Sequence, residues 1–249
     1  MRLKEMELYL AEYKTATIEE LCNKFEIHPN TARSDVKELA EKGVIQRSYG
    51  RVDYVATNPL VSFVDRQHYN HNEKIAIGKA AVELLVEDDI IYVDAGTTTL
   101  TLFQKGVKLP DNLTVVSHNL DVINWVVQNT EYNVFVLPGK VNRKLNAFAS
   151  LETIESLKTY NIKKAFIGTR GISSKGELSS TSSIDAKLKR TAIEISETVV
   201  LMADSRKLNN TALFNFSNLS EIDFWACEHI TDEISDACKQ ANIKLLCQN

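Results

Sequence analysis

The sequence lacks the features that mark exported, membrane-spanning or metal-bound proteins. No window approaches the roughly 18 consecutive apolar residues of a membrane helix, and charges interrupt the first ten residues, MRLKEMELYL. The four cysteines form no CxxC pair and have no histidines at metal-ligand spacing, which favours free thiols in a reducing compartment; they are Cys22, Cys227, Cys238 and Cys247. These absences predict a cytoplasmic protein that has no membrane partner and no metal site.

The chain also lacks an excess of positive charge. It contains 29 Lys and Arg against 33 Asp and Glu, for a formal net charge of -4. Proteins that bind nucleic acid without sequence preference normally carry a basic surface. We therefore expect any contact with DNA to be confined to a small part of the chain.

Motifs of the common nucleophilic and nucleotide-hydrolysing enzymes are missing as well. There is no Gly-x-Ser-x-Gly elbow and no Walker-type loop. His118 stands alone on its predicted loop, and His68 and His71 have no partners at ligand spacing, so surface or hydrogen-bonding roles are favoured over metal binding. The length of 249 residues, with 44% hydrophobic and 25% charged residues, fits one large globular domain or one of ordinary size with a small companion.

Residues 1–57 contain three short helical patterns followed by a hairpin pattern. Apolar residues recur at helical spacing over residues 3–13, and Thr17 with Glu20 forms a capping-box pattern before a second helix. Pro29 suits the first turn of a third helix, and Gly43 suits its C-terminal cap. After it, two apolar-rich runs around Ser48 to Arg51 predict a hairpin that turns at Gly50.

Three helices and a hairpin within 57 residues predict a winged helix-turn-helix whose third helix reads DNA. The face of this helix opposite Ala32, Val36 and Leu39 can bond base edges and phosphates. The predicted DNA-binding residues are Pro29, Asn30, Thr31, Arg33, Ser34, Lys37, Arg47 and Arg51. Residues 33–52 hold five basic and three acidic residues, a local positive excess in an acidic protein. The alternative is a three-helix protein-interaction module with a solvated, charged face.

Beyond a connector at residues 58–72, with a partly helical pattern, short apolar strands alternate with helices to the end of the chain. Nearly all-apolar strands of four to seven residues are typical of a sheet covered on both faces, and the alternation implies mostly parallel order. We therefore predict a larger, mostly parallel α/β domain over residues 73–249. The aromatic residues Trp125, Phe135, Phe166 and Trp225 are spaced like core residues.

Small, polar or cationic residues follow the predicted strands, where open parallel sheets bind their ligands. Thr97, Thr98 and Thr99 precede a predicted helix over residues 99–106 and would offer hydroxyls, backbone donors and the positive end of the helix dipole to a phosphate. Asp94 would accept from sugar hydroxyls, since two anions repel. Glycines would allow close backbone approach and cations would converge on the anion; these residues are Gly96, Gly139, Gly168, Gly171, Arg143, Arg170, Lys189 and Lys207.

The motifs, taken in order, resemble the DeoR family of bacterial transcriptional regulators over nearly the whole chain. They are TIEELCNKFEIHPNTARSDVKELAEKGVIQRSYGRV followed by DAGTTT, SHNLDV, LPGKVNR, AFIGTRGIS, DAKLKR and ADSRK. The resemblance implies a winged helix-turn-helix joined to a sensor domain similar to ribose-5-phosphate isomerase and CoA transferases. It further implies that a phosphorylated sugar bound by the sensor domain changes operator affinity.

Matched motif by motif, the resemblance assigns further residues to the sensor site. Asp94, Gly96 and the threonine triplet match the phosphate loop. The other matches are Asn119, Gly139, Arg143, Gly168, Gly171, Asp185, Lys189 and Lys207. The predicted ligand-binding set also includes His118, which adjoins Asn119. Three motifs depart from the family pattern. Ser34 stands where a second arginine is usual, Gly-Arg-Val at residues 50–52 replaces Gly-Gly-Ala, and Lys140 replaces a glycine and adds a cation near the pocket.

These patterns predict a DNA-binding repressor of carbohydrate-metabolism genes. Its partners would be a double-stranded operator and a phosphorylated sugar, with no other cofactor, and it would act as a homo-oligomer, a dimer or tetramer, because one small winged module binds an operator weakly alone. The main alternative is a sugar-phosphate isomerase or CoA-transferase-like enzyme using Asp94, Asp121, Asp185 or Asp204. The isomerase's acidic catalytic run is missing, however. A third possibility keeps the fold and makes the front module a protein-binding device.

Overall fold

The computed structural model describes residues 2–13, 15–41, 44–48, 50–54, 71–104 and 107–247. The chain divides into two compact units, Met1–Tyr69 and Asn70–Asn249. The predicted cap at Gly43 and the predicted connector up to residue 70 lie outside the described residues.

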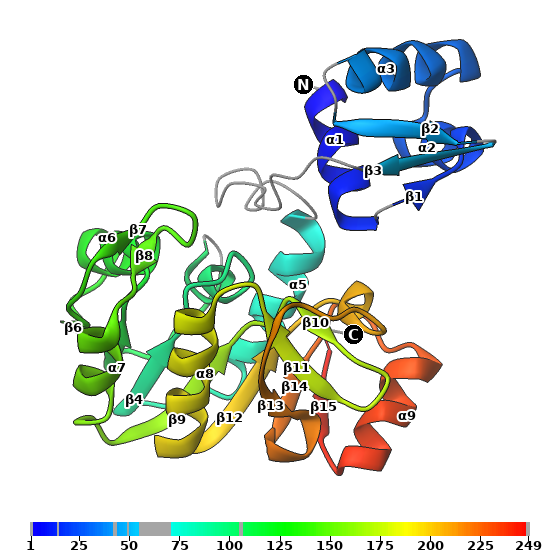
Figure 1. The fold of residues 1–249 in the computed structure, drawn as a ribbon. Coiled ribbons are helices and arrows are strands. Elements are labelled where there is room, and N and C mark those ends of the chain that lie inside the picture. The colour runs from blue at the N-terminus through cyan, green and yellow to red at the C-terminus, as the bar shows by residue number, and fades with distance from the viewer. Residues whose placement is uncertain are drawn as a thin grey trace. The chain divides into compact units, whose positions relative to one another are not determined.

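The first unit has the predicted three helices and hairpin (Figure 1), so the winged helix-turn-helix is confirmed. A short strand between the first two helices, which the sequence did not reveal, completes an antiparallel sheet of order β1-β3-β2. The elements are α1 (Arg2–Tyr13), β1 (Thr15–Ala16), α2 (Ile18–Phe25), α3 (Pro29–Glu41), β2 (Ile45–Ser48) and β3 (Arg51–Tyr54).

Local sequence signals fix these elements. The Thr17 hydroxyl accepts from the Glu20 N–H at 3.1 Å, and the Glu20 carboxylate accepts from the Thr17 N–H at 2.6 Å, which is the predicted capping box. Gly50 turns the hairpin with φ of +75°. The Arg2 guanidinium donates to both carboxylate oxygens of Asp35, at 2.7 and 3.0 Å, and so ties α1 to α3.

The second unit is built on the predicted parallel sheet, which has seven strands in the order β15-β14-β12-β9-β4-β5-β6. All six neighbouring pairs are parallel. The strands are β4 (Asp89–Val93), β5 (Leu113–Ser117), β6 (Asn133–Val136), β9 (Ile162–Ile167), β12 (Ser196–Met202), β14 (Phe224–Ala226) and β15 (Lys244–Leu246).

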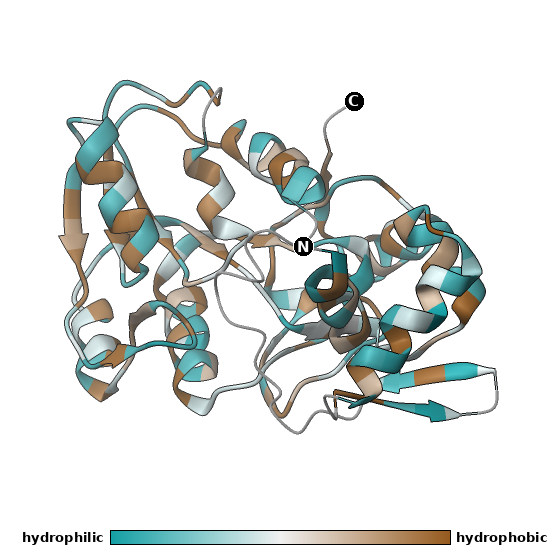
Figure 2. Ribbon diagram, turned by 90° about the horizontal axis from the view of Figure 1, so that it is seen from above, coloured by the Kyte–Doolittle hydropathy of each residue, from teal (hydrophilic) through white to brown (hydrophobic). Residues whose placement is uncertain are grey.

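Helices cover both faces of this sheet. One core contains Ile91 and Val93 of β4 with α5 (His71–Val82), the 3-10 helix η1 (Thr99–Phe103) and α6 (Leu120–Asn129). The other contains Tyr92 with α7 (Leu151–Leu157), α8 (Ser183–Ile195) and α9 (Asp232–Ala241). Successive strand residues thus face opposite layers. Apolar and polar residues alternate along the helices (Figure 2), as helices packed on one side require.

Two smaller antiparallel sheets were not predicted. Strands β10 (Gly171–Ile172), β11 (Glu177–Ser180) and β13 (Phe214–Asn218) form one, and β7 (Val141–Asn142) with β8 (Ala147–Phe148) forms a hairpin. The hairpin covers the loop after β4, because its Leu145 and Ala147 pack on Ala95. Two further 3-10 turns are η2 (Ser205–Lys207) and η3 (Leu219–Glu221).

The helix predicted over residues 99–106 is wrong in kind, since η1 is a five-residue 3-10 helix. The Thr99 and Thr101 hydroxyls donate to nearby backbone carbonyls, and such bonds compete with regular helix. A full α-helix dipole therefore does not point at the threonine triplet.

The prediction that four aromatic residues lie in the core is wrong for Phe135. Phe135 is 46% exposed because its strand, β6, is the last of the sheet. Phe166 and Trp225 are fully buried, and the Trp225 indole donates to the Ala203 carbonyl at 2.8 Å. Trp125 is half-buried against Phe103, with ring centroids 5.5 Å apart. Within the described ranges, no helix is both long and apolar enough to traverse a bilayer.

Candidate functional site

The carboxyl ends of β4 and β9 meet where the strand order of the large sheet reverses. From β4 the chain continues outward through β5 and β6, whereas β9 begins the opposite half. Open parallel sheets bind ligands at such a switch point. Asp94 directly follows β4 and Gly168 directly follows β9, and the Gly168 N–H donates to Asp94 Oδ2 at 3.1 Å. The switch point therefore places a carboxylate at its centre.

A buried ion-pair cluster, Asp94, Asp185 and Lys189, occupies this position. Lys189 Nζ of α8 pairs with Asp94 Oδ2 and lies 3.5 Å from Asp185 Oδ1. Asp185 also accepts from the Ser180 hydroxyl at 2.5 Å. All three charged side chains are at least 94% buried. Asp185 and Lys189 are four residues apart, which puts them on one face of α8.

The charges of the cluster sustain one another. Burial alone would raise the pKa of Asp94, but Lys189, His118 and the hydrogen bonds outweigh it and hold the pKa below its ordinary value. Burial likewise opposes the charge on Lys189, yet Asp185 and Asp94 raise its pKa. Asp94 and Lys189 are therefore both ionised at neutral pH.

His118 extends the cluster beyond β5. It is fully buried, with Nδ1 3.2 Å from the Tyr92 hydroxyl and the two rings stacked at 5.8 Å. Burial lowers the pKa of His118, the nearby charges notwithstanding, so its ring is neutral at pH 7. Of the two roles expected for this histidine, hydrogen bonding is the one that the structure shows.

Four buried polar atoms of this region have no hydrogen-bond partner among the described residues. They are Asp94 Oδ1, His118 Nε2, Asn119 Nδ2 and Asp185 Oδ1, the last of which has only its 3.5 Å ion-pair contact with Lys189. The Asn119 amide oxygen is already used to cap α6, accepting from Asp121 and Val122. Since buried polar atoms are nearly always paired, this mixed set of acceptors and a donor fits a molecule that carries several hydroxyl groups, because a hydroxyl both donates and accepts.

The loop after β4 is braced from within by one of its three threonines. The Thr99 hydroxyl donates to the Asp94 carbonyl at 2.7 Å and accepts from the Gly96 N–H at 3.1 Å. A Cβ at Gly96 would lie 2.9 Å from the same hydroxyl oxygen, so glycine is needed there. The Thr97 and Thr98 hydroxyls take no part in this brace, and Thr98 is the more exposed of the two.

A second charge cluster lies at the end of β12. Asp204 pairs with Arg206 Nε at 2.9 Å and with Lys207 Nζ at 3.9 Å. Burial would raise the pKa of Asp204, but Lys207, Arg206 and the buried Lys74 of α5 lower it. Sequence reasoning found Lys207 and missed the other two cations. Arg206 belongs to the ADSRK motif, which was already part of the prediction. Lys74 lies on the apolar side of α5, and a lysine in that position indicates a buried charge.

Two predicted glycines have structural explanations. A Cβ on Gly139, whose φ is +143°, would lie 2.4 Å from the Thr153 hydroxyl at the start of α7. A Cβ on Gly171 would lie 2.3 Å from the Asn210 carbonyl. Both positions therefore require glycine for packing, whether or not a ligand is present.

The remaining predicted cations lie outside the buried cluster. Lys140 and Arg143 are exposed before and within the hairpin that covers the loop after β4. Arg170 is half-buried, and its backbone N–H donates to Ser179 at 2.9 Å. The structure thus brings together Asp94, Gly168, Asp185 and Lys189 with His118, places Lys207 in the second cluster, and leaves the other cations at the periphery.

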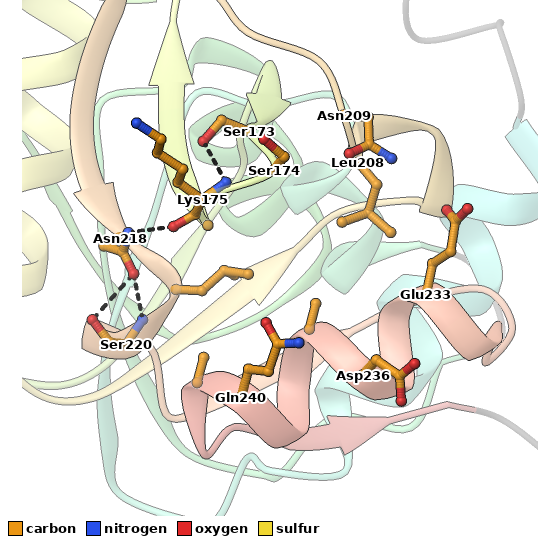
Figure 3. Close-up of a pocket in the computed structure, with 14 residues that line it drawn as sticks. Ser173, Ser174, Lys175, Leu208, Asn209, Asn218, Ser220, Glu233, Asp236 and Gln240 are labelled. Carbon is orange, nitrogen blue, oxygen red and sulfur yellow. Dashed lines mark hydrogen bonds between the residues drawn. The ribbon is translucent and has the colours of Figure 1, made fainter.

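A separate pocket of about 500 Å³ lies beside α9. Figure 3 shows Glu233, Asp236 and Gln240 of α9 along one wall and the turn at residues 173–175 along the other. Among the described residues that line it, none belongs to the predicted ligand set. Its acidic side chains, Glu233 and Asp236, are exposed. Within the described chain, no group of three or more His, Cys, Asp or Glu residues is placed to hold a metal.

The predicted DNA-binding residues lie on α3 and the hairpin. The apolar side of α3 is buried, whereas Pro29, Asn30, Arg33, Ser34 and Lys37 are exposed and Thr31 is half-buried. Arg33 donates to the Asn30 side chain at 3.3 Å, and Lys37 lies 3.8 Å from Glu41. Arg47 and Arg51 are exposed on the two strands of the hairpin. This surface can contact the base edges and phosphates of a major groove.

Two family models together match nearly the whole chain. The DeoR-like helix-turn-helix domain matches residues 2–58, and the DeoR C terminal sensor domain matches residues 69–233. Among curated proteins, the HTH-type transcriptional regulator IolR of Bacillus subtilis is 28% identical over 98% of this chain and 97% of its own.

Other relatives differ in the direction of regulation that their names state. The L-fucose operon activator of Haemophilus influenzae is 29% identical over 92% of each chain. The glycerol-3-phosphate regulon repressor of Escherichia coli is 26% identical over 82% of this chain and 81% of that protein.

The solved structure of ribose 5-phosphate isomerase A from Methanocaldococcus jannaschii has a TM-score of 0.40 and 15% identity, covering 56% of this chain and 55% of that one.

Proposed function

Because the chain belongs to the DeoR family of transcriptional regulators, we propose that it represses carbohydrate genes until a phosphorylated sugar binds at the β4–β9 switch point. The ligand-binding part of this proposal rests on the buried polar atoms around the Asp94–Lys189 pair that have no hydrogen-bond partner among the described residues. They suit the hydroxyl groups of a sugar. The Thr97–Thr98 segment beside them supplies hydroxyls and backbone donors for the phosphate.

The site suits binding better than acid–base catalysis. An isomerase needs a general base whose pKa lies near the working pH. The pKa values of Asp94 and Asp204 are both held below their ordinary values, and Lys189 is kept charged by its two carboxylates. Such groups fix a ligand by charge and hydrogen bonding and are poorly matched to moving protons at neutral pH.

Regulation follows from thermodynamic linkage. A ligand that binds one arrangement of the regulator better than another shifts the population toward that arrangement, and with it the DNA affinity. The DNA-binding unit is small and offers one exposed recognition helix, so we propose that at least two copies bind one operator, with their helices at a fixed half-site spacing.

The decisive experiment measures fluorescence anisotropy of labelled DNA from upstream of the protein's own gene. Glycerol 3-phosphate, glucose 6-phosphate and fructose 1-phosphate would be tested beside the corresponding unphosphorylated compounds. Specific binding at low salt that one sugar phosphate weakens supports the proposal, and binding that it strengthens would reverse the direction of regulation. No specific DNA binding, or turnover of a sugar phosphate, would contradict the proposal.

A single variant tests the location of the phosphate. Thr98→Val keeps the shape of the side chain and removes the hydroxyl, so effector affinity should fall by about 0.5–1.5 kcal/mol while DNA affinity without effector stays unchanged. Isothermal titration and anisotropy measure the two. Thr211→Val, at an exposed threonine far along the chain, is the matched control. Equal loss of both affinities would show that Thr98 is structural.

A further inference from the structure

We propose that the Thr101 hydroxyl couples the ligand loop to α5, the helix that follows the connector from the DNA-binding unit. This inference rests on the function proposed above and adds a residue that transmits the effect of the ligand. Thr101 lies in η1, is buried, and contacts two carbonyl oxygens from segments 24 residues apart in sequence.

The two carbonyls belong to the two parts that must communicate. Thr101 Oγ1 lies 2.5 Å from the carbonyl oxygen of Thr98, a member of the threonine triplet. It lies 2.8 Å from the carbonyl oxygen of Lys74, in the first turn of α5. One side chain therefore touches the backbone of the candidate ligand loop and the backbone of the helix.

A threonine hydroxyl has only one proton to donate. Two carbonyl oxygens within hydrogen-bonding distance must therefore compete for that proton or share it in a weaker, bifurcated bond. A ligand that draws the Thr98 segment toward itself lengthens one contact and leaves the proton to Lys74. The hydroxyl thus has two discrete arrangements, which is the kind of element that allosteric coupling requires.

The segments around the Thr101 hydroxyl are closely packed, so a displacement of the Thr98 segment is passed on to its neighbours. A Cβ on Gly78 of α5 would lie 2.4 Å from the Thr101 carbonyl oxygen and 2.5 Å from its hydroxyl oxygen, so η1 sits directly on the helix backbone. Gln104 Nε2 adds a bond of 3.1 Å to the Ile75 carbonyl. Closely packed segments transmit displacement, so a shift of the Thr98 segment reaches the first turn of α5.

That first turn is also linked to the second charge cluster. Lys74 is buried near Asp204, whose pKa it helps to lower. Its carbonyl oxygen therefore contacts the hydroxyl that also reaches the ligand loop, while its positive charge acts on Asp204, which follows β12. The first residue of α5, His71, lies two positions after Tyr69, the end of the first unit. A change in this turn acts where the polypeptide leaves the sensor unit.

The test compares Thr101→Val with Thr101→Ser in the full-length protein. The probes are glycerol 3-phosphate, glucose 6-phosphate and fructose 1-phosphate; the one that alters DNA binding by the wild type is carried forward. Valine removes the hydroxyl, so we expect the probe to bind within about threefold of wild type while its effect on DNA affinity shrinks by about threefold to tenfold. Serine keeps the hydroxyl and should restore the effect.

Thr130→Val is the matched control, because the Thr130 hydroxyl also donates to a carbonyl, that of Val126, at 2.8 Å in α6. It should leave coupling unchanged. Full coupling in Thr101→Val would overturn the inference while leaving the proposed function intact. A wild-type protein whose DNA binding responds to none of the probes would instead count against the proposed function.

A measurement on the wild-type protein covers the case in which Thr101→Val does not fold. Hydrogen exchange of the amides at residues 74–78 should slow on adding the effective probe, because the Thr101 hydroxyl then donates to the Lys74 carbonyl alone. Amides of α9 serve as the internal reference. Equal behaviour of α5 and α9 would overturn the inference.

Discussion

The two units of this regulator use charged side chains in opposite ways. On α3 and the hairpin the cations are exposed and held by weak contacts, such as Lys37 with Glu41 at 3.8 Å. At the β4–β9 switch point Asp94, Asp185 and Lys189 are buried, and Lys189 pairs with both carboxylates. Exposed charges stay available to a large partner that brings its own charges, whereas buried charges must be paired and can enclose only a small ligand. The difference predicts where a substitution harms stability and where it harms recognition alone.

The largest effect should come from removing the cation of the buried cluster. Lys189→Met leaves two carboxylates, Asp94 and Asp185, without their shared partner, and breaking a buried pair in this way costs about 3–5 kcal/mol. Urea unfolding monitored by circular dichroism measures the loss. Lys158→Met is the control, because its pair with Glu155 is exposed and should contribute less than about 1 kcal/mol.

If Lys189→Met and Lys158→Met lose similar unfolding free energy, the contrast between the two units fails, because the buried pair then behaves like a surface pair. A sharper test of the same pair combines Asp94→Asn with Lys189→Met in one protein. The double variant should be more stable than the sum of the single losses implies, because each substitution removes the group that the other leaves unpaired.

In the DNA-binding unit a single exposed cation should affect binding and not stability. Arg33→Ala should weaken operator binding by about 1–3 kcal/mol and relax base preference if the contact is bidentate to guanine. Its unfolding free energy should change by less than about 0.5 kcal/mol. Anisotropy titrations against operator and scrambled DNA test the first expectation. Lys187→Ala, exposed on α8, removes the same charge from the other unit and should leave binding unchanged.

The smallest predicted effect is a pH dependence that originates at His118. Its environment contains Tyr92, Asp94, Asp185 and Lys189, and burial lowers its pKa below the ordinary 6.5. Between the two values the unfolded chain binds a proton that the folded chain does not, so stability falls as the pH drops below about 6.5, by at most about 1.4 kcal/mol per pH unit. Asp94, with a lowered pKa, contributes such a loss only in stronger acid.

Unfolding measured from pH 7.5 to 5.5 in the wild type, His118→Gln and His229→Gln checks this assignment. The slope should diminish in His118→Gln, and His229→Gln, a substitution at an exposed histidine, is the control. An unchanged slope in that variant would assign the pH dependence to another group.

Much of the DNA-binding unit could be predicted because its signals are local. The capping box joins Thr17 and Glu20, which are three positions apart, and the apolar side of α3 follows from helical spacing alone. The strand β1 escaped because two residues carry no periodicity, and it forms only by pairing with β3.

The candidate ligand site could be predicted only in part, because its contacts join distant positions. Strand ends indicated Asp94, but its partner Lys189 lies 95 residues away and is set by the packing of α8 on the sheet. Spacing also could not show that the Thr99 hydroxyl is used inside its own loop or that Phe135 lies on an edge strand. These features depend on tertiary packing, which a linear pattern does not record.

The positions of the two tryptophans have a practical consequence. The Trp125 ring lies tilted against that of Phe103, the last residue of η1, and the Trp225 indole donates to the carbonyl of Ala203, the residue just before Asp204. Indole emission depends on local polarity, so each ring is a built-in optical reporter for one side of the switch point. Replacing either tryptophan with phenylalanine leaves one indole, whose fluorescence reports the environment of the remaining side of the switch point without an attached dye.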